Sequence, residues 1–143
     1  ETYTCTIVGS VNVYKRQVMF APYDEFAKGV KIAVDEAGLT DQIKIYSADV
    51  STADIAAMRE PGSAWVATVA TNPAVVGEVS VRTLAMLLAG EETEHNVVVP
   101  PTLITQKFLN ANDIKNMADL GTNMPQFAHA DVSVPAWMPL PAR

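Results

Sequence analysis

Short apolar runs rich in β-branched residues recur along the chain and predict buried strands. They occupy residues 3–9, 17–21, 43–48 and 64–71. A fifth run covers residues 96–105, but Pro100 and Pro101 interrupt it. Because proline cannot donate to a ladder of hydrogen bonds, this run belongs at a sheet edge or at a crossing point. All five runs are far too short to cross a bilayer.

Apolar residues at helical spacing fill most of the intervals between these strands. Asp24 begins the first helix, where its carboxylate caps free backbone N–H groups, and Gly38 ends it. Its apolar stripe consists of Phe26, Val30, Ala33, Val34 and Ala37. We expect this stripe to face the core.

Two more helices are marked by the residues at which they begin. Ser51 and Asp54 form a capping-box pattern ahead of a short helix that stops before a Pro-Gly pair. Asn72 followed by Pro73 is the preferred order at a helix start, and Gly90 ends that helix. Its expected buried face consists of Val76, Val79, Thr83, Leu84, Leu87 and Leu88.

The C-terminal part of the chain has a different character. A short helix is predicted near residues 112–120. Beyond it, four of the nine prolines fall within residues 121–143, and the periodicity fades. We therefore expect an extended tail, anchored by burial of the Trp137 ring against the body of the protein. His129 in this tail is expected to be an ordinary solvated or hydrogen-bonded side chain.

The alternation of strand and helix predicts an α/β fold with a mainly parallel sheet flanked by helices. A length of 143 residues suits one domain of ordinary size. Only seven residues separate the strands at 3–9 and 17–21, whereas a crossover between parallel strands takes about a dozen or more. We interpret this shortage as a missing segment near residues 10–16.

Composition excludes several classes of function. Acidic residues outnumber basic ones sixteen to ten, giving a net charge of −6, so a nucleic-acid partner is not expected. Cys5 is the only cysteine, and His95 and His129 lack a metal-ligand spacing. Ser10 has no nucleophile elbow, and no glycine-rich phosphate loop is present. We therefore expect neither catalysis nor a metal or other cofactor.

Polar residues stand where the predicted strands end, which is where parallel sheets bind ligands. These residues are Tyr23, Asp49, Thr71 and Asn72. A carboxylate accepts two hydroxyl hydrogen bonds at once, which suits a vicinal diol, and a tyrosine ring stacks on the C–H face of a sugar. The set therefore predicts a site for a neutral, polyhydroxylated ligand, although Asp49 alone is also compatible with a simple turn cap.

Four motifs in sequence order carry a resemblance to a known family. They are VMFAPYDEFAKGVKIAVDEAG, IKIYSADV, WVATVATNPAVVGEVSVRTLAMLLAGEE and VVVPPTLIT, within about residues 17–110. Together they resemble the C-terminal portion of type I periplasmic sugar-binding proteins, the ribose-binding-protein-like receptors of ABC transporters. This resemblance implies two α/β lobes that close on a sugar, a monomer that docks on a membrane permease, and a periplasmic or other extracytoplasmic location.

The resemblance also implies roles for three of the strand-end residues. Tyr23 falls on a ligand-contacting position, Asp49 on the aspartate that binds sugar hydroxyls, and Thr71 on a polar position at the hinge. Tyrosine and threonine replace the family's common Asn or Asp and Gln, respectively. The resemblance therefore implies the class of ligand but not which sugar is bound. The two replacements favour a more open or acyclic polyol.

The resemblance divides the chain into four parts. They are a ligand-binding C-terminal lobe at 1–72, a helix at 73–91 that packs on an N-terminal lobe not contained here, a crossing strand and final helix at 92–120, and the tail at 121–143. Two alternative functions stay open. An effector-binding domain of a LacI-type transcription regulator would carry a DNA-binding headpiece upstream, and a receiver-like or flavodoxin-like enzyme would use Asp49 to bind a divalent metal.

Overall fold

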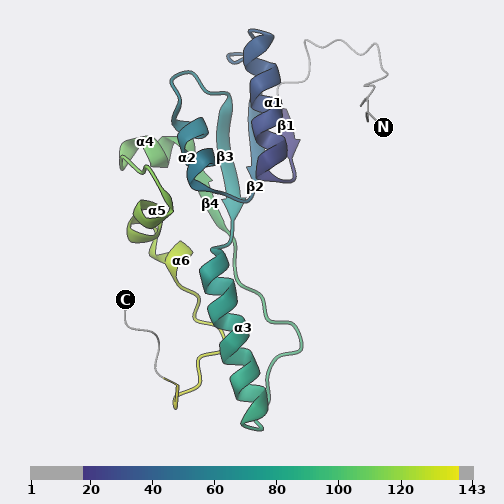
Figure 1. Cartoon of the computed structure of the whole chain (residues 1–143), viewed down its shortest axis with the longest axis vertical. Helices are drawn as coiled ribbons and strands as arrows, with labels where there is room; N and C mark the ends of the chain where they lie inside the picture. The colour runs from purple at the N-terminus through teal and green to yellow at the C-terminus, as the bar shows by residue number, and fades with distance from the viewer. Residues whose placement is uncertain (1–17, 139–143) are drawn as a thin grey trace, which may run out of the picture.

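The fold is built on a four-stranded sheet, in a computed structural model that describes residues 18–138 (Figure 1). The strands, in spatial order, are β1 (Val18–Ala21), β2 (Lys44–Ala48), β3 (Trp65–Ala70) and β4 (Thr102–Thr105). The first three are parallel, and β4 runs antiparallel to β3. The predicted α/β fold with a mainly parallel sheet is confirmed. The predicted strand at 3–9 and the shortage near 10–16 lie outside the described residues.

Six helices accompany the sheet in the described part of the chain. They are α1 (Asp24–Glu36), α2 (Thr52–Arg59), α3 (Pro73–Leu88), α4 (Gln106–Ala111), α5 (Met117–Asn123) and α6 (Pro125–Ala128). Helices α1, α2 and α4 lie beside the strands, whereas α3 extends away from the sheet beyond the end of β3 (Figure 1). Most of the core therefore lies between the sheet and the first group.

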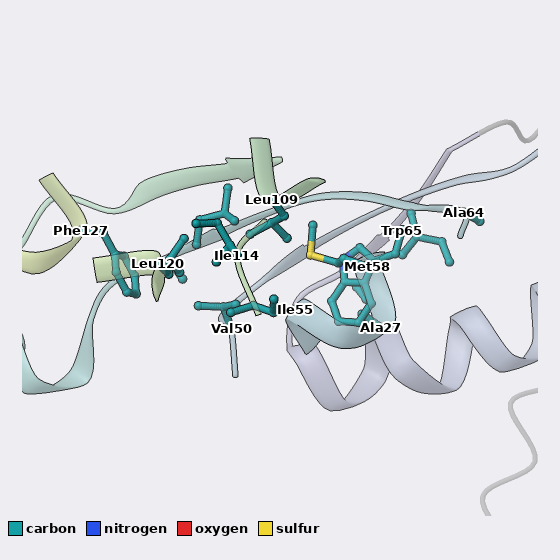
Figure 2. Packing of buried hydrophobic residues seen from close by; sticks show 14 of the residues in the cluster. Ala27, Val50, Ile55, Met58, Ala64, Trp65, Leu109, Ile114, Leu120 and Phe127 are labelled. Atoms are coloured by element: carbon teal, nitrogen blue, oxygen red, sulfur yellow. The ribbon is translucent and has the colours of Figure 1, made fainter. Parts of the chain in front are cut away.

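The core is a continuous row of buried side chains that runs from Trp65 to Phe127 (Figure 2). Ile55 and Met58 of α2 and Leu109 of α4 are fully buried within it. On the opposite face of the sheet, large apolar side chains remain exposed: Phe20, Tyr46 and Leu103. The helices are thus held to the sheet by one apolar layer.

The predicted buried stripe of α1 is only partly correct. Val34 is buried and Val30 packs against the core as predicted, but Phe26 is 61% exposed, and Asp24, Ala27 and Lys31 are buried as well. A face that contains a lysine can be buried here because the Lys31 ammonium is paired with Asp35 and Glu60. Ion pairs with Asp35 on the same helix and with Glu60 after α2 thus allow a lysine on the face of α1 that meets the sheet.

The predicted buried face of α3 is also largely wrong in the described structure. Val79 is buried as expected, but Leu84, Leu87 and Leu88 are exposed. The segment at 130–133 covers a different side of the helix, because the buried Arg82 guanidinium donates to backbone carbonyls there. An apolar strip of α3 is therefore left open to solvent.

The single helix predicted near 112–120 is replaced by two helices, α4 and α5. The Thr105 hydroxyl accepts the Phe108 N–H at 3.2 Å and begins α4. The Asn116 side chain accepts the Asp119 N–H at 2.9 Å and begins α5. Residues 112–116 form the turn between them, because these two caps fix where each helix starts.

The tail at 121–143 is less extended than predicted. Helix α5 continues into it, α6 follows, and Met124 and Phe127 are buried in the core. The Trp137 ring was expected to be buried, but it is 53% exposed. Its indole N–H donates to the Glu91 carboxylate, so a polar contact takes the place of the expected apolar anchor.

The predicted helix termini are confirmed at three positions. Ser51 and Asp54 form a complete capping box, and the Asn72 side chain accepts the Ala74 N–H at 3.0 Å. Gly38 follows α1 with a φ of 66°, in the left-handed region. Its own N–H and that of Leu39 return to helix carbonyls, which closes the end of α1.

Two glycine substitutions in and after α1 should have opposite effects. Gly38→Ala should lower the free energy of unfolding by about 1–2 kcal/mol, because left-handed backbone is costly for an L-residue even where the Cβ meets no atom. Gly29→Ala, in the interior of α1 with equally open space, should raise it by about 0.5–1 kcal/mol. Urea unfolding measures both. Equal effects from the two alanines would contradict the conformational explanation.

Candidate functional site

The parallel strands bring the predicted site residues to one edge of the sheet. Ala21 of β1 pairs with Ser47 of β2, and Ala48 of β2 pairs with Val69 of β3. The carboxyl ends of the three strands are therefore level. The loops that follow them carry Tyr23, Asp49, Thr71 and Asn72. Because neighbouring strands are about 4.8 Å apart, all four residues belong to one stretch of surface.

Asp49 is held in an unusual conformation by its neighbour β3. Its φ is 75°, which is uncommon for any residue except glycine. The Asp49 N–H donates to the Val69 carbonyl at 2.8 Å, and the Asp49 carbonyl accepts the Thr68 hydroxyl at 2.6 Å. Oδ1 accepts the Val50 N–H at 2.9 Å. The exposed carboxylate is thus fixed in place, and Oδ2 is left for a ligand.

Tyr23 presents its ring beside a second aromatic residue that the sequence analysis did not assign to the site. Tyr23 is 47% exposed, and its ring meets that of Phe26 edge to face, with the centroids 5.8 Å apart. Phe26 lies three residues after Tyr23, which is about one helical turn. This spacing in the sequence could have predicted that the two rings lie together. The two rings form an exposed apolar wall beside a polar edge.

The structure corrects the role predicted for Asp24. Tyr23 occupies the N-cap position of α1, and its side chain makes no capping hydrogen bond. Asp24 is the first helical residue, and its Oδ1 accepts the N–H of Glu25 at 2.8 Å. Asp24 is therefore a buried residue of the first helical turn and not the N-cap residue that precedes the helix.

Thr71 and Asn72 are half-buried at the point where β3 passes into α3. One lone pair of the Asn72 Oδ1 is already used, because it accepts the N–H of Ala74 in the helix cap. The Asn72 side chain can therefore offer a ligand both Nδ2–H donors and the second lone pair of Oδ1. The structure places both residues at the predicted edge, and their contact with a ligand stays a prediction.

Two hollows lie away from this edge. One of about 950 Å³ is lined by residues 100–103, 125–126 and 129–132. A smaller one of about 290 Å³ is apolar and lies between α3 and residues 97–99. Neither is lined by any of the four predicted residues, so the candidate site is an open polar edge and not one of these two hollows.

The chemistry available at this edge is that of binding. Within residues 18–138, no group of three or more His, Cys, Asp or Glu side chains is arranged to hold a metal ion. In the same part of the chain, no helix has both the length and the apolar character that a membrane span requires. The edge offers one fixed carboxylate, hydroxyl and amide groups, and two aromatic rings.

Comparison with known proteins agrees with this arrangement. The model of a family described as a periplasmic binding protein domain matches residues 11–92. The chain belongs to the periplasmic binding protein family. The predicted resemblance is thereby confirmed, and so is the expectation of a binding protein instead of an enzyme, since the similar solved structures are transporter proteins. No curated protein matches.

Three transporter proteins with solved structures are similar to this chain. A 5-methylthioribose transporter solute-binding protein from Thermotoga lettingae TMO, in complex with 5-methylthioribose, is 42% identical over 85% of this chain and 38% of its own, with a TM-score of 0.77. A sugar ABC transporter protein from Yersinia enterocolitica is 33% identical over 80% of this chain and 34% of its own, with a TM-score of 0.70. An ABC transporter solute-binding protein from Agrobacterium vitis with bound allitol is 28% identical over 66% of this chain and 32% of its own, with a TM-score of 0.61. The chain spans about a third of the length of these structures.

Proposed function

We propose that the chain is part of the extracytoplasmic solute-binding component of an ABC transporter and binds a neutral monosaccharide or polyol. Membership of the periplasmic binding protein family supports an extracytoplasmic location, for which we propose the periplasm. The relatives from Thermotoga lettingae and Agrobacterium vitis were solved with 5-methylthioribose and allitol, both neutral polyhydroxylated molecules. Their transport role favours the receptor over the effector-binding domain of a transcription regulator.

The observation that carries this proposal is the fixed carboxylate of Asp49. Its backbone is held by β3 through both its N–H and its carbonyl, in a left-handed conformation. Costly backbone conformations persist where the surrounding structure enforces them, and they cluster at binding sites. A carboxylate held in this way accepts hydroxyl hydrogen bonds from a diol without first being ordered. Tyr23, Thr71 and Asn72 complete the proposed set of ligand contacts.

We propose that residues 1–72 belong to one lobe and that the helix at 73–91 packs on a second lobe. Support comes from the exposed apolar strip of α3, where Leu84 is 56%, Leu87 54% and Leu88 80% exposed. Residues 92–120 then return to the first lobe, and the segment that follows contributes Met124 and Phe127 to its core.

In this mechanism the sugar bridges the two lobes and stabilises the closed state through contacts that the open state lacks. The closed form, as a monomer, would then dock on a membrane permease. The differential contacts drive the closure, because a ligand shifts an equilibrium only by its difference in affinity for the two states.

Substitution of Asp49 tests the site. Each charge-assisted hydrogen bond lost costs about 1.5–3 kcal/mol, so Asp49→Ala should weaken sugar binding at least about tenfold. Asp41→Asn, which removes an exposed acid from the turn between α1 and β2, is the matched control and should bind like the wild type. Native mass spectrometry of the protein in its native length identifies the ligand from neutral pentoses, hexoses, polyols and 5-methylthioribose. Titration calorimetry then measures its affinity.

Either of two results would contradict the proposal. Unchanged affinity in the Asp49→Ala protein would remove this residue from the site. A wild-type protein that binds none of the panel would assign the edge to another class of small molecule.

A further inference from the structure

Two buried carboxylates lie in the first turns of α1 and α2, and the second is near enough to raise the pKa of the first. Asp24 is the first residue of α1 and 7% exposed, and Asp54 is the third residue of α2 and fully buried. The two loops that lead into these helices carry Tyr23 and Asp49. The pair therefore lies directly behind the polar edge of the sheet.

The hydrogen bonds of the pair are incomplete as long as both side chains are ionised. Asp54 Oδ2 accepts the Ser51 N–H at 2.5 Å, but its buried Oδ1 has no hydrogen-bond donor in the described structure. The Lys28 ammonium is 3.6 Å from that oxygen, which is an ion pair but too long for a hydrogen bond, and it hydrogen-bonds Glu25 instead. An acceptor in this position costs free energy until a donor reaches it.

Asp24 can supply the missing donor, because two carboxyl groups form a hydrogen bond when one of them carries a proton. Burial, reinforced by the neighbouring Asp54, raises the pKa of Asp24 above its ordinary value, although the Glu25 N–H and Lys28 partly oppose this. The charged groups that act on the pair in the described structure are Lys28 and, through it, Glu25. Both lie on α1.

We propose that Asp24 and Asp54 form a proton-dependent link that sets the spacing between the Tyr23 loop and the Asp49 loop. With a proton on Asp24, its O–H donates to Asp54 and the two helix starts are held together. Without that proton, the two carboxylates repel and the link is weakened. Asp24 and Asp54 are thus positioning residues, and their effect on the ligand rests on the sugar-binding function proposed above.

The direction of the pH dependence follows from the raised pKa of Asp24. The folded state holds this proton more tightly than the unfolded chain, so the contribution of Asp24 to stability is greatest at acidic pH. It is lost as the pH rises through the pKa that Asp24 has in the folded protein. At neutral pH an ionised Asp24 therefore lowers stability.

Asp24→Asn replaces the titrating donor by a permanent one, since the amide N–H can donate to Asp54 at any pH. Compared with the wild type, the melting temperature of this variant should be about 4 °C higher at pH 7.5, and the difference should vanish near pH 4. Asp41→Asn, the loss of an exposed acid, should give a small difference that does not change with pH. Parallel pH profiles for the wild type and Asp24→Asn would overturn the link.

Two backbone amides report on the pair separately. The Glu25 N–H donates to Asp24, and the Ser51 N–H donates to Asp54. In NMR titrations of the wild type, the Glu25 amide resonance should follow the protonation of Asp24, with a midpoint above the ordinary value for aspartate, and the Ser51 resonance should follow the same transition. In Asp24→Asn the Ser51 resonance should lose that transition. Separate midpoints in the wild type would show that the two carboxyl groups do not share a proton, and would overturn the proposal.

Ligand affinity provides the functional measurement. The affinity of the wild type for its sugar should rise several-fold between pH 7.5 and pH 5, whereas that of Asp24→Asn should stay constant. An affinity that varies equally in both proteins would exclude a positioning role. If no sugar binds at all, the proposed function fails, while the melting and NMR measurements still decide whether the link exists.

Discussion

Trp65→Ala is expected to lower the free energy of unfolding by about 3–5 kcal/mol. The Trp65 ring is fully buried at the start of β3, and its indole N–H donates to the hydroxyl of Ser47 at 2.9 Å. Alanine would leave a cavity in the core and a buried hydroxyl without its donor. Urea unfolding followed by circular dichroism measures the loss.

The chain provides its own control, because its other tryptophan is exposed. Trp137→Ala removes an equal ring from a position that is 53% exposed, together with its hydrogen bond to Glu91, and should lower the free energy of unfolding by about 1 kcal/mol or less. Trp65→Phe keeps much of the ring but loses the bond to Ser47 and should cost about 1–3 kcal/mol. Equal losses from the two alanine variants would show that Trp65 does not anchor the core.

Arg82→Met should release the C-terminal segment from α3. The buried Arg82 guanidinium donates to the carbonyls of Ala130 at 3.1 Å and Val132 at 2.9 Å, and it pairs with Glu78. Methionine fills similar space but donates nothing. Breaking such a buried arrangement costs about 3–5 kcal/mol, and we expect the lower end because Glu78 is partly exposed.

Hydrogen exchange locates this effect along the chain. In Arg82→Met, the amides of residues 130–133 should exchange faster, while those of β2 and β3 keep their protection. Lys115→Met, which breaks an exposed ion pair with Asp113, is the control and should cost about 1 kcal/mol or less. Unchanged exchange at 130–133 would mean that Arg82 does not hold this segment.

The features that were predicted correctly depend on residues close together in sequence. The capping box of Ser51 and Asp54, the cap at Asn72 and the left-handed Gly38 are decided within one helical turn. The parallel sheet follows from the order of strands and helices. Together these local signals placed all four predicted site residues at one edge.

The features that were missed depend on contacts between distant residues. Lys31 is buried beside Glu60, the residue that follows α2, and the pattern of α1 alone does not reveal this pairing. The side of α3 that is covered likewise depends on the contacts of Arg82 with Ala130 and Val132. Thr68 was not predicted to matter because a buried hydroxyl looks ordinary in sequence, and only the fold brings it to Asp49. Asp54 was predicted as a helix cap, but the sequence did not show that it lies near Asp24.

The arrangement of β3 and β4 has a mechanical consequence for α3. The chain leaves the sheet at the end of β3 and re-enters it at the start of β4, at the same end of the sheet. The pairing of these two strands extends as far as Ala70 and Thr102. α3 is thus attached by two backbone segments that lie side by side. Pro73 lies at the first attachment, and Pro100 and Pro101 lie at the second. Their fixed φ angles leave the backbone fewer bonds about which α3 can turn relative to the sheet, and the contacts of Arg82 with Ala130 and Val132 add a third attachment.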